Sequence, residues 1–187
     1  MITHRNLRAM GMGYFVDVDP ITVQDAAVYA APMSHGAGIY AIPHLMAGAR
    51  HVIPASGGFD AAELFALGLQ VGPMSMFAAP TIVKRLVDEA QAQGWGPERC
   101  AQSFKTIVYG GAPMYAADIQ RALRVMGPRF VQIYGQGGAP DGGDLPVTAT
   151  SAAGATPPPC AATGLHRGGA NAGAGAHRRC QWLGPAL

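Results

Sequence analysis

Charge, cysteine and long apolar runs are all scarce in this sequence. Charged residues make up 13% of the 187 residues, and the net charge of +2 is too small to indicate nucleic acid or an acidic membrane surface as a partner. The three cysteines, Cys100, Cys160 and Cys180, are odd in number and lack the spacing of metal or redox motifs, so we expect no disulfide framework. These features favour a reducing, cytoplasmic setting.

The sequence also lacks the signals that direct a chain into a membrane. Its N-terminus has no basic segment followed by an apolar one, and no stretch of about 18 apolar residues is free of polar residues and helix breakers. We therefore expect no membrane span. Hydrophobic residues nevertheless make up 49% of the chain, which is enough for the core of one domain.

The large apolar residues are confined mainly to the first part of the chain. All nine methionines, all six phenylalanines, every isoleucine and every glutamate precede residue 137. From Gly137 onward the sequence consists mainly of Gly, Ala, Pro, Thr and Arg, a composition that buries too little surface to offset the entropy of ordering. We therefore predict a folded part over residues 1–137 and a disordered, Gly/Ala/Pro-rich tail over residues 138–187.

Residues 1–137 alternate between the apolar spacings of strands and of helices. Short apolar runs predict strands at Ala26–Met33, His51–Pro54, Gly72–Ala79, Phe104–Tyr109 and Phe130–Tyr134. Helical spacing predicts helices at Arg8–Phe15 (with Thr3 as a candidate N-cap), Ile39–Ala47, Asp60–Gln70, Pro80–Gln93 and Ala116–Met126. Loops are expected at Asp17–Asp25, Ser34–Gly38 and Gly94–Gln102. This alternation predicts an α/β layer architecture.

The stretch from Phe104 to Gly137 is predicted to form a βαβ unit. Gly110-Gly111-Ala112-Pro113 interrupts its first strand, Gly127-Pro128 ends its helix, and Gly135-Gln136-Gly137 follows its second strand. Such a unit joins parallel strands by a right-handed crossover, which brings both glycine turns to one edge of the sheet. Open α/β sheets bind ligands at that edge, and small residues there let backbone N–H groups approach a phosphate or a flat ring.

Four segments resemble, in order and spacing, the motifs of a single family. They are Thr3-His4-Arg5-Asn6-Leu7, Pro32-Met33-Ser34-His35-Gly36-Ala37-Gly38, Gly110-Gly111-Ala112-Pro113-Met114 and Tyr134-Gly135-Gln136-Gly137. The first is similar to the segment that follows the phosphate loop in AMP-forming acyl-CoA synthetases, the adenylate-forming ligases. The others resemble that family's Pro-x-x-His-x-x-Gly motif, its Gly-Gly-Ala-Pro turn and the start of its Tyr-Gly-x-Thr-Glu motif. The resemblance covers nearly all of residues 1–137 and implies a central fragment of the large N-terminal domain.

The resemblance implies a fold, a reaction and a set of site residues. The fold would be a partial mixed or parallel sheet with flanking helices. In the reaction a carboxylic acid attacks ATP, with Mg²⁺ as the metal, to give an acyl-adenylate and pyrophosphate, and coenzyme A then takes the acyl group. His35 and Gly111 would line the acyl pocket. The nucleotide would be bound by Gly110, Gly111, Ala112, Tyr134, Gly135, Gln136 and Gly137.

The sequence also departs from the family's pattern. The family's phosphate loop precedes the segment at which this sequence begins. In the Tyr-Gly-x-Thr-Glu motif, Gly137 stands at the Thr and Gly138 at the magnesium-binding Glu. Nothing matches the catalytic Lys of the small C-terminal domain. We therefore assign no catalytic or metal-binding residue and expect this chain alone to be inactive. The change in composition suggests a reading frame lost just after Gln136 or Gly137. Two alternatives remain, a non-catalytic nucleotide- or acyl-binding remnant and a truncated gene product without function.

Other motifs in the sequence carry weaker predictions. His4, His44 and His51 are candidate metal ligands, but their spacing lacks a second-ligand pattern and favours ordinary structural roles. Gly11-Met12-Gly13 is half of a dinucleotide-binding fingerprint without the strand that should precede it. We interpret the scattered methionines as core residues.

Overall fold

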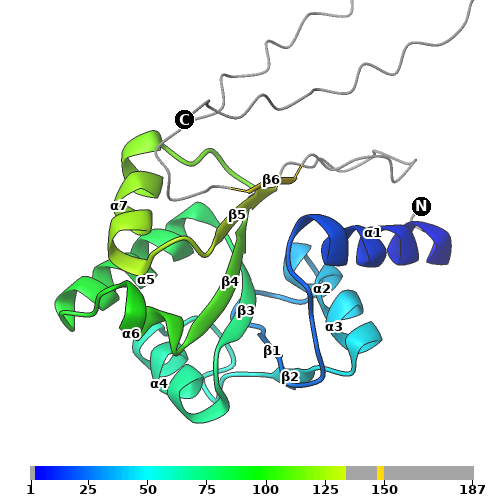
Figure 1. Cartoon of the computed structure of the whole chain (residues 1–187), viewed down its shortest axis with the longest axis horizontal. Helices are drawn as coiled ribbons and strands as arrows, with labels where there is room; N and C mark the ends of the chain where they lie inside the picture. The colour runs from blue at the N-terminus through cyan, green and yellow to red at the C-terminus, as the bar shows by residue number, and fades with distance from the viewer. Residues whose placement is uncertain (1–2, 134–146, 150–187) are drawn as a thin grey trace, which may run out of the picture. The chain divides into compact units, whose positions relative to one another are not determined.

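A six-stranded sheet organises the part of the chain that the computed structural model describes, residues 3–133 and 147–149 (Figure 1). The strands are β1 (Ala26–Val28), β2 (Arg50–Val52), β3 (Met74–Ala78), β4 (Phe104–Tyr109), β5 (Phe130–Ile133) and β6 (Val147–Ala149). They lie in the order β2-β1-β3-β4-β5-β6. All neighbours pair in parallel except β6, which pairs antiparallel with β5. The expected mixed α/β sheet with flanking helices is confirmed.

Local signals in the sequence mark the ends of several of the seven helices that the structure describes. They are α1 (His4–Asp17), α2 (Gly36–Ile39), α3 (Ala41–Ala47), α4 (Ala61–Val71), α5 (Pro80–Ala92), α6 (Pro97–Ala101) and α7 (Ala116–Met126). Thr3 caps α1 in a capping box with Asn6, which confirms the predicted N-cap. Asp60 caps α4 by accepting a hydrogen bond from the Glu63 backbone, and α3 ends at Gly48, whose φ is 68°.

Several predicted boundaries were wrong. The strand predicted for Ala26–Met33 ends at Val28, and the helix predicted for Arg8–Phe15 runs from His4 to Asp17. The loop predicted for Gly94–Gln102 contains α6, because Pro97 with its fixed φ is suited to the first helical position. The turn predicted for Ser34–Gly38 ends in α2, which begins at Gly36.

The disorder predicted for the tail is wrong at β6. Val147, Thr148 and Ala149 pair with Ile133, Gln132 and Val131 of β5. Backbone groups on the outer edge of β5 can pair with any extended segment, so this strand needs no large apolar side chains. The remainder of residues 138–187, like Tyr134 to Gly137, lies outside the described residues.

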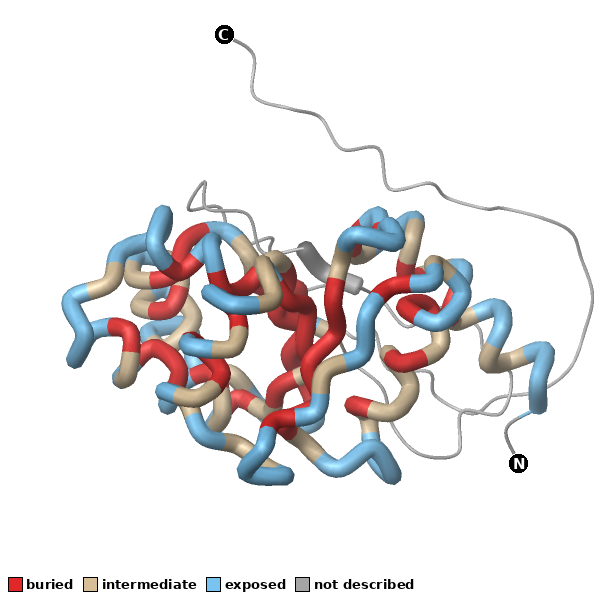
Figure 2. Tube along the Cα trace, turned by 90° about the horizontal axis from the view of Figure 1, so that it is seen from below, coloured by how far each residue is buried: buried red, intermediate tan, exposed pale blue. Residues whose placement is uncertain are grey.

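The sheet separates two helical layers. Figure 1 shows α4 to α7 beside one face and α1 to α3 beside the other. Met74, Met76 and Ala78 of β3 join the main core, whereas Phe77 packs in a second cluster on the opposite face. Figure 2 shows the buried residues concentrated in the middle of the molecule, with exposed residues around them. Central strands buried on both faces explain why their sequences are nearly continuous apolar runs.

A polar cluster ties the connection between α1 and β1 to the start of β4. Lys105 Nζ lies 3.1 Å from Asp19 Oδ1 and 3.0 Å from Asp25 Oδ2. The Thr106 hydroxyl donates to Asp19 Oδ2 over 2.7 Å. Burial alone would raise the pKa of Asp25, but hydrogen bonds from the Thr22 backbone and from Lys105 outweigh burial and lower it. The cluster holds this connection in place although its members are far apart in the sequence.

No helix in residues 3–133 or 147–149 has the length and apolar character needed to cross a membrane.

Candidate functional site

The carboxyl edge of the parallel sheet brings together the two segments that the sequence singled out. The His35 segment follows β1, and the Gly110-Gly111-Ala112 turn follows β4. Between β1 and β4 lies β3, which pairs in parallel with both. Strands in a sheet are about 4.8 Å apart, so β1 and β4 are separated by about 10 Å at this edge. This is the edge at which open α/β sheets bind ligands.

Close contacts across the end of β3 hold both segments. A Cβ added to Gly36 would lie 3.0 Å from Phe77 Cζ, so the glycine allows the first turn of α2 to rest on this ring. The Phe77 ring in turn stacks on Tyr40, with ring centres 5.6 Å apart. On the other side of β3, the Gly110 N–H donates to the Ala78 carbonyl over 3.2 Å. The end of β3 therefore fixes the two segments relative to each other.

Gly38 determines how His35 is presented. A Cβ at Gly38 would lie 1.8 Å from the Met33 carbonyl oxygen, so only glycine permits the chain to fold back this tightly. His35 is the exposed residue that precedes α2, and its Nδ1 lies 3.0 Å from the Ser34 hydroxyl. The imidazole is therefore accessible at the sheet edge.

The glycines of the second turn have different surroundings. Gly110 is buried, and a Cβ there would lie 2.8 Å from the Ile133 carbonyl oxygen. Gly111 is exposed and has a φ of +84°, and a Cβ there would meet nothing within 4 Å. The turn is thus anchored at Gly110 and opens to free space at Gly111, where a backbone without a side chain can be approached closely.

Four of the predicted nucleotide-binding residues lie beyond the end of β5. Tyr134, Gly135, Gln136 and Gly137 lie outside the described residues, although β5 ends at Ile133 on the same edge of the sheet. An aromatic side chain that the sequence reasoning did not select, Tyr115, follows the Gly110 turn and is 72% exposed. Its sequence position next to the glycine turn was the only available signal.

Two of the three histidines that we considered as metal ligands, His44 and His51, have other partners. His44 is 1% exposed, and its Nδ1 donates to the Tyr40 carbonyl over 2.7 Å. Burial lowers the pKa of His44, so the ring is neutral in the folded protein. His51 Nδ1 lies 2.7 Å from the Tyr29 hydroxyl, and burial raises the pKa of Tyr29 to about 12. Among the described residues, no three His, Cys, Asp or Glu side chains are grouped to hold a metal ion.

In the Gly11-Met12-Gly13 segment of α1, Gly11 serves helix packing. A Cβ at Gly11 would lie 3.0 Å from Met46 Sδ and 3.3 Å from Ile42 Cγ2, so the small residue lets α1 approach α3. Gly11-Met12-Gly13 is therefore helical and is not a phosphate-binding turn.

Comparison with known proteins identifies relatives for most of this chain. The family model described as "AMP-binding enzyme" matches residues 1–139. The medium/long-chain-fatty-acid–CoA ligase FadD8 of Mycobacterium tuberculosis is 27% identical over 109 residues, which are 58% of this chain and 18% of that protein. The chain therefore spans less than a fifth of the length of this relative.

Solved structures share the fold of the described part. ATP-bound MatB from Rhodopseudomonas palustris aligns with a TM-score of 0.60 and 22% identity, over 73% of this chain and 26% of that chain. A malonyl-CoA ligase in complex with methylmalonyl-CoA and AMP aligns with a TM-score of 0.58 and 24% identity, over 73% and 29% of the two chains. The family model covers well over half of the sequence and the fold agrees with it. The chain belongs to the AMP-binding enzyme family.

Proposed function

We propose that this chain is a central piece of an ATP-dependent acyl-CoA synthetase. The whole protein would convert a carboxylic acid and ATP to an acyl-adenylate and pyrophosphate, and then transfer the acyl group to coenzyme A in the cytoplasm. The names of the relatives, a fatty-acid–CoA ligase and a malonyl-CoA ligase, support this reaction. The observation that carries the proposal is the sheet edge where β3 fixes the His35 segment beside the glycine turn.

In this proposal each segment contacts a different part of the acyl-adenylate. The Gly110-Gly111-Ala112 turn lies beside the adenine and the acyl chain, because Gly111 leaves its backbone open to space. His35 lies in the acyl pocket, near the reacting carboxylate. Tyr134 and residues 135–137 complete the nucleotide side. The open turn at Gly111 fits a flat ring, which supports AMP as the ligand.

The magnesium ion of the family is not assigned to any residue of this chain. Gly138 stands where the family has the metal-binding Glu, and this glycine has no side chain to donate an oxygen. Electrostatic stabilisation of the transition state supplies much of the catalysis in such sites, so the 187-residue polypeptide by itself is proposed to be inactive.

We also propose that the chain is divided at residue 137. Residues 1–137 form the partial AMP-binding domain, and residues 138–187 are a tail whose reading frame differs from that of the family. Genomic DNA tests this directly, because another frame of the tail should encode the continuation of a synthetase. If no such continuation exists, the frameshift hypothesis is wrong.

Two experiments test the function. Titration calorimetry with AMP, or with a non-hydrolysable acyl-adenylate analogue, should give saturable binding if the glycine turn serves as proposed. Pyrophosphate release should not exceed background when ATP, Mg²⁺ and fatty acids are added to the purified polypeptide. Measurable release would contradict the proposed inactivity.

A non-catalytic nucleotide binder is the second candidate. Gly137 and Gly138 favour it, because these substitutions remove side chains from the metal side of the motif but leave the turn at Gly110 intact. Binding of AMP without pyrophosphate release would support this role. Absence of a cooperative thermal transition would instead indicate that the chain is a truncated gene product without function.

A further inference from the structure

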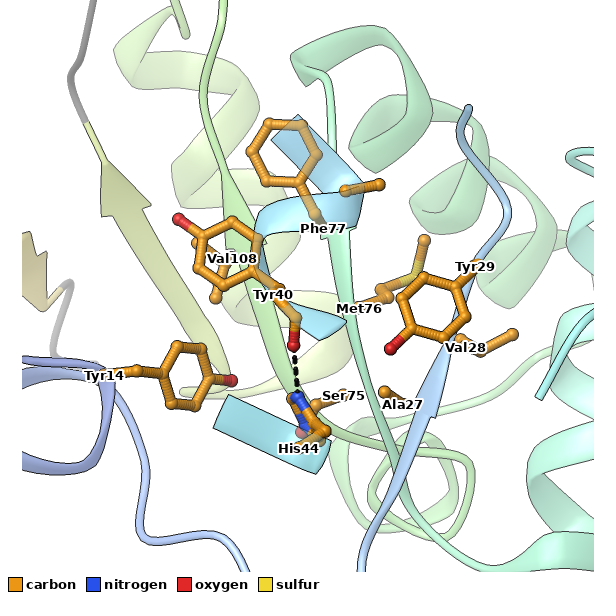
Figure 3. A pocket seen from close by; sticks show the side chains of 11 residues that line it. Tyr14, Ala27, Val28, Tyr29, Tyr40, His44, Ser75, Met76, Phe77 and Val108 are labelled. Atoms are coloured by element: carbon orange, nitrogen blue, oxygen red, sulfur yellow. Dashed lines mark hydrogen bonds between the residues drawn. The ribbon is translucent and has the colours of Figure 1, made fainter. Parts of the chain in front are cut away.

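A small cavity lies between the sheet and the helices beneath the His35 segment. Its volume is about 10 Å³. The lining comes from α1, α2, α3, three strands and two residues beside them, Tyr29 after β1 and Tyr40 before α3. Its polar members are Tyr14, Tyr29, Tyr40, His44 and Ser75. Figure 3 shows the hydroxyl groups of Tyr14 and Tyr29 directed inward from opposite sides, with His44 and Ser75 between them. A cavity of this size holds about one water molecule.

Two buried polar side chains that line this cavity, His44 and Ser75, have hydrogen-bonding capacity that the protein leaves unused. His44 is 1% and Ser75 is 2% exposed. In the described part of the chain, His44 Nε2 has no hydrogen-bond partner, and the polar group that interacts with Ser75 Oγ is the Tyr14 hydroxyl. A buried polar atom left unpaired costs about 1–3 kcal/mol, and native structures rarely contain one.

The chemistry of these atoms is complementary. His44 Nδ1 donates to the Tyr40 carbonyl, which leaves Nε2 with a lone pair that needs a donor. The Ser75 hydroxyl can donate one hydrogen bond and accept others. Burial, with the charge of Asp19, raises the pKa of Tyr14 and keeps its hydroxyl protonated as a further donor. A group that both donates and accepts would satisfy all of these atoms.

We propose that an internal water molecule occupies this cavity and bridges His44 Nε2 to Ser75 Oγ, with the Tyr14 hydroxyl as a third partner. The water donates a hydrogen bond to the Nε2 lone pair and accepts one from Ser75 or Tyr14. Its size matches the cavity, and polar atoms on several sides provide the partners that an internal water requires. The bridge joins α3, which carries His44, to β3, which carries Ser75.

The bridge also positions the His35 segment. His44 holds the Tyr40 carbonyl, the Tyr40 ring stacks on Phe77, and the Phe77 ring lies against Gly36 next to His35. Ser75 and His44 are therefore positioning residues. This consequence for the acyl pocket rests on the proposed function, whereas the water site itself does not.

Solution NMR of the labelled full chain tests the water site. The His44 imidazole should be the Nδ1–H tautomer, and magnetisation should transfer between a long-lived water and the protons beside Nε2 and on the Ser75 side chain. A direct Ser75–His44 hydrogen bond, or absence of transfer from water to both residues, would overturn the proposal. Neither measurement depends on AMP binding, so loss of the proposed function would leave this result unaffected.

A matched pair of variants tests the positioning role. Ser75→Ala should abolish the water transfer to His44 and shift the His35 ring resonances. The control, Ser103→Ala, also changes a fully buried serine, but that hydroxyl donates to the Phe65 carbonyl elsewhere in the core. Ser103→Ala should leave the water transfer to His44 and the His35 ring resonances unchanged. Retained water transfer in Ser75→Ala, or an equal His35 shift in both variants, would refute the role of Ser75. If Ser75→Ala does not fold, the wild-type measurement still decides whether the water is present.

Discussion

Replacement of Gly111 by alanine separates the binding role of the glycine turn from its effect on folding. Gly111 has a φ of +84°, and an added Cβ meets no atom within 4 Å. The methyl group therefore introduces backbone strain but no clash within the protein. A left-handed conformation destabilises an L-residue by about 1–2 kcal/mol. The alanine also lowers the conformational entropy of the unfolded chain, which stabilises the variant by about 0.4–1 kcal/mol. Gly111→Ala should thus lower the free energy of unfolding by about 1 kcal/mol.

Gly94 provides a control with the same backbone demand. Its φ is +67°, an added Cβ there also meets nothing within 4 Å, and it follows α5, away from the carboxyl edge of the sheet. Gly94→Ala should therefore lose about the same stability in urea unfolding.

The two variants should differ in their affinity for AMP. In the proposed site the methyl group at residue 111 projects into the space that the ligand occupies, and we expect affinity to fall at least about tenfold, equivalent to about 1.4 kcal/mol. Gly94→Ala should bind AMP as the wild type does. Titration calorimetry, at a temperature where both variants are folded, measures the difference. Equal affinities in both variants would refute the placement of the nucleotide at this turn.

Further predictions concern stability. Gly38→Ala should lower the free energy of unfolding by about 3 kcal/mol or more, because its Cβ would lie 1.8 Å from a backbone oxygen, and urea unfolding measures this. Thr106→Val should lower it by about 1–3 kcal/mol by removing the hydroxyl that donates to buried Asp19, with Thr106→Ser as the conservative control. Burial lowers the His44 pKa below 6.5, so the imidazole binds a proton more readily in the unfolded chain than in the folded protein. Stability should fall as pH drops below 6.5, by up to about 1.4 kcal/mol per pH unit, and His44→Phe should flatten this slope. Asp25, whose pKa in the folded protein is lowered from 3.8, should contribute to the free energy of unfolding until the pH falls well below the range of His44. A single loss of stability over one pH range would contradict the assignment of the two effects to His44 and Asp25.

Sequence patterns predicted the elements well where apolar spacing and a local signal agreed. The helix at Ala116–Met126 and the strand at Phe104–Tyr109 have the predicted bounds, since Gly127 and Gly110 mark their ends. Short elements were predicted less well. α6 and α2 are 5 and 4 residues long, too short for a periodic pattern, and β6 depends on the edge of β5 for its hydrogen bonds.

The candidate site shows the same division between local and distant information. His35 and the glycine turn were selected from motifs, but their relation through Phe77 and Ala78 required the strand order β1-β3-β4. The pairing of Lys105 with Asp19 and Asp25 had no sequence signal, because about 80 residues separate the partners along the chain.

The sequence by itself determined the α/β class, the family and the residues of two glycine-rich segments, because these depend on local spacing and on short motifs. Only the tertiary structure decided which glycines are sterically required, which histidine is buried, and where polar atoms meet. Gly38, Gly110 and Gly111 look alike in the sequence. The nearest atom to an added Cβ is a carbonyl oxygen at 1.8 Å for Gly38 and another at 2.8 Å for Gly110, whereas Gly111 has no atom within 4 Å, and these differences give the glycines different roles. Packing between distant segments sets those neighbours, and no local pattern contains that information.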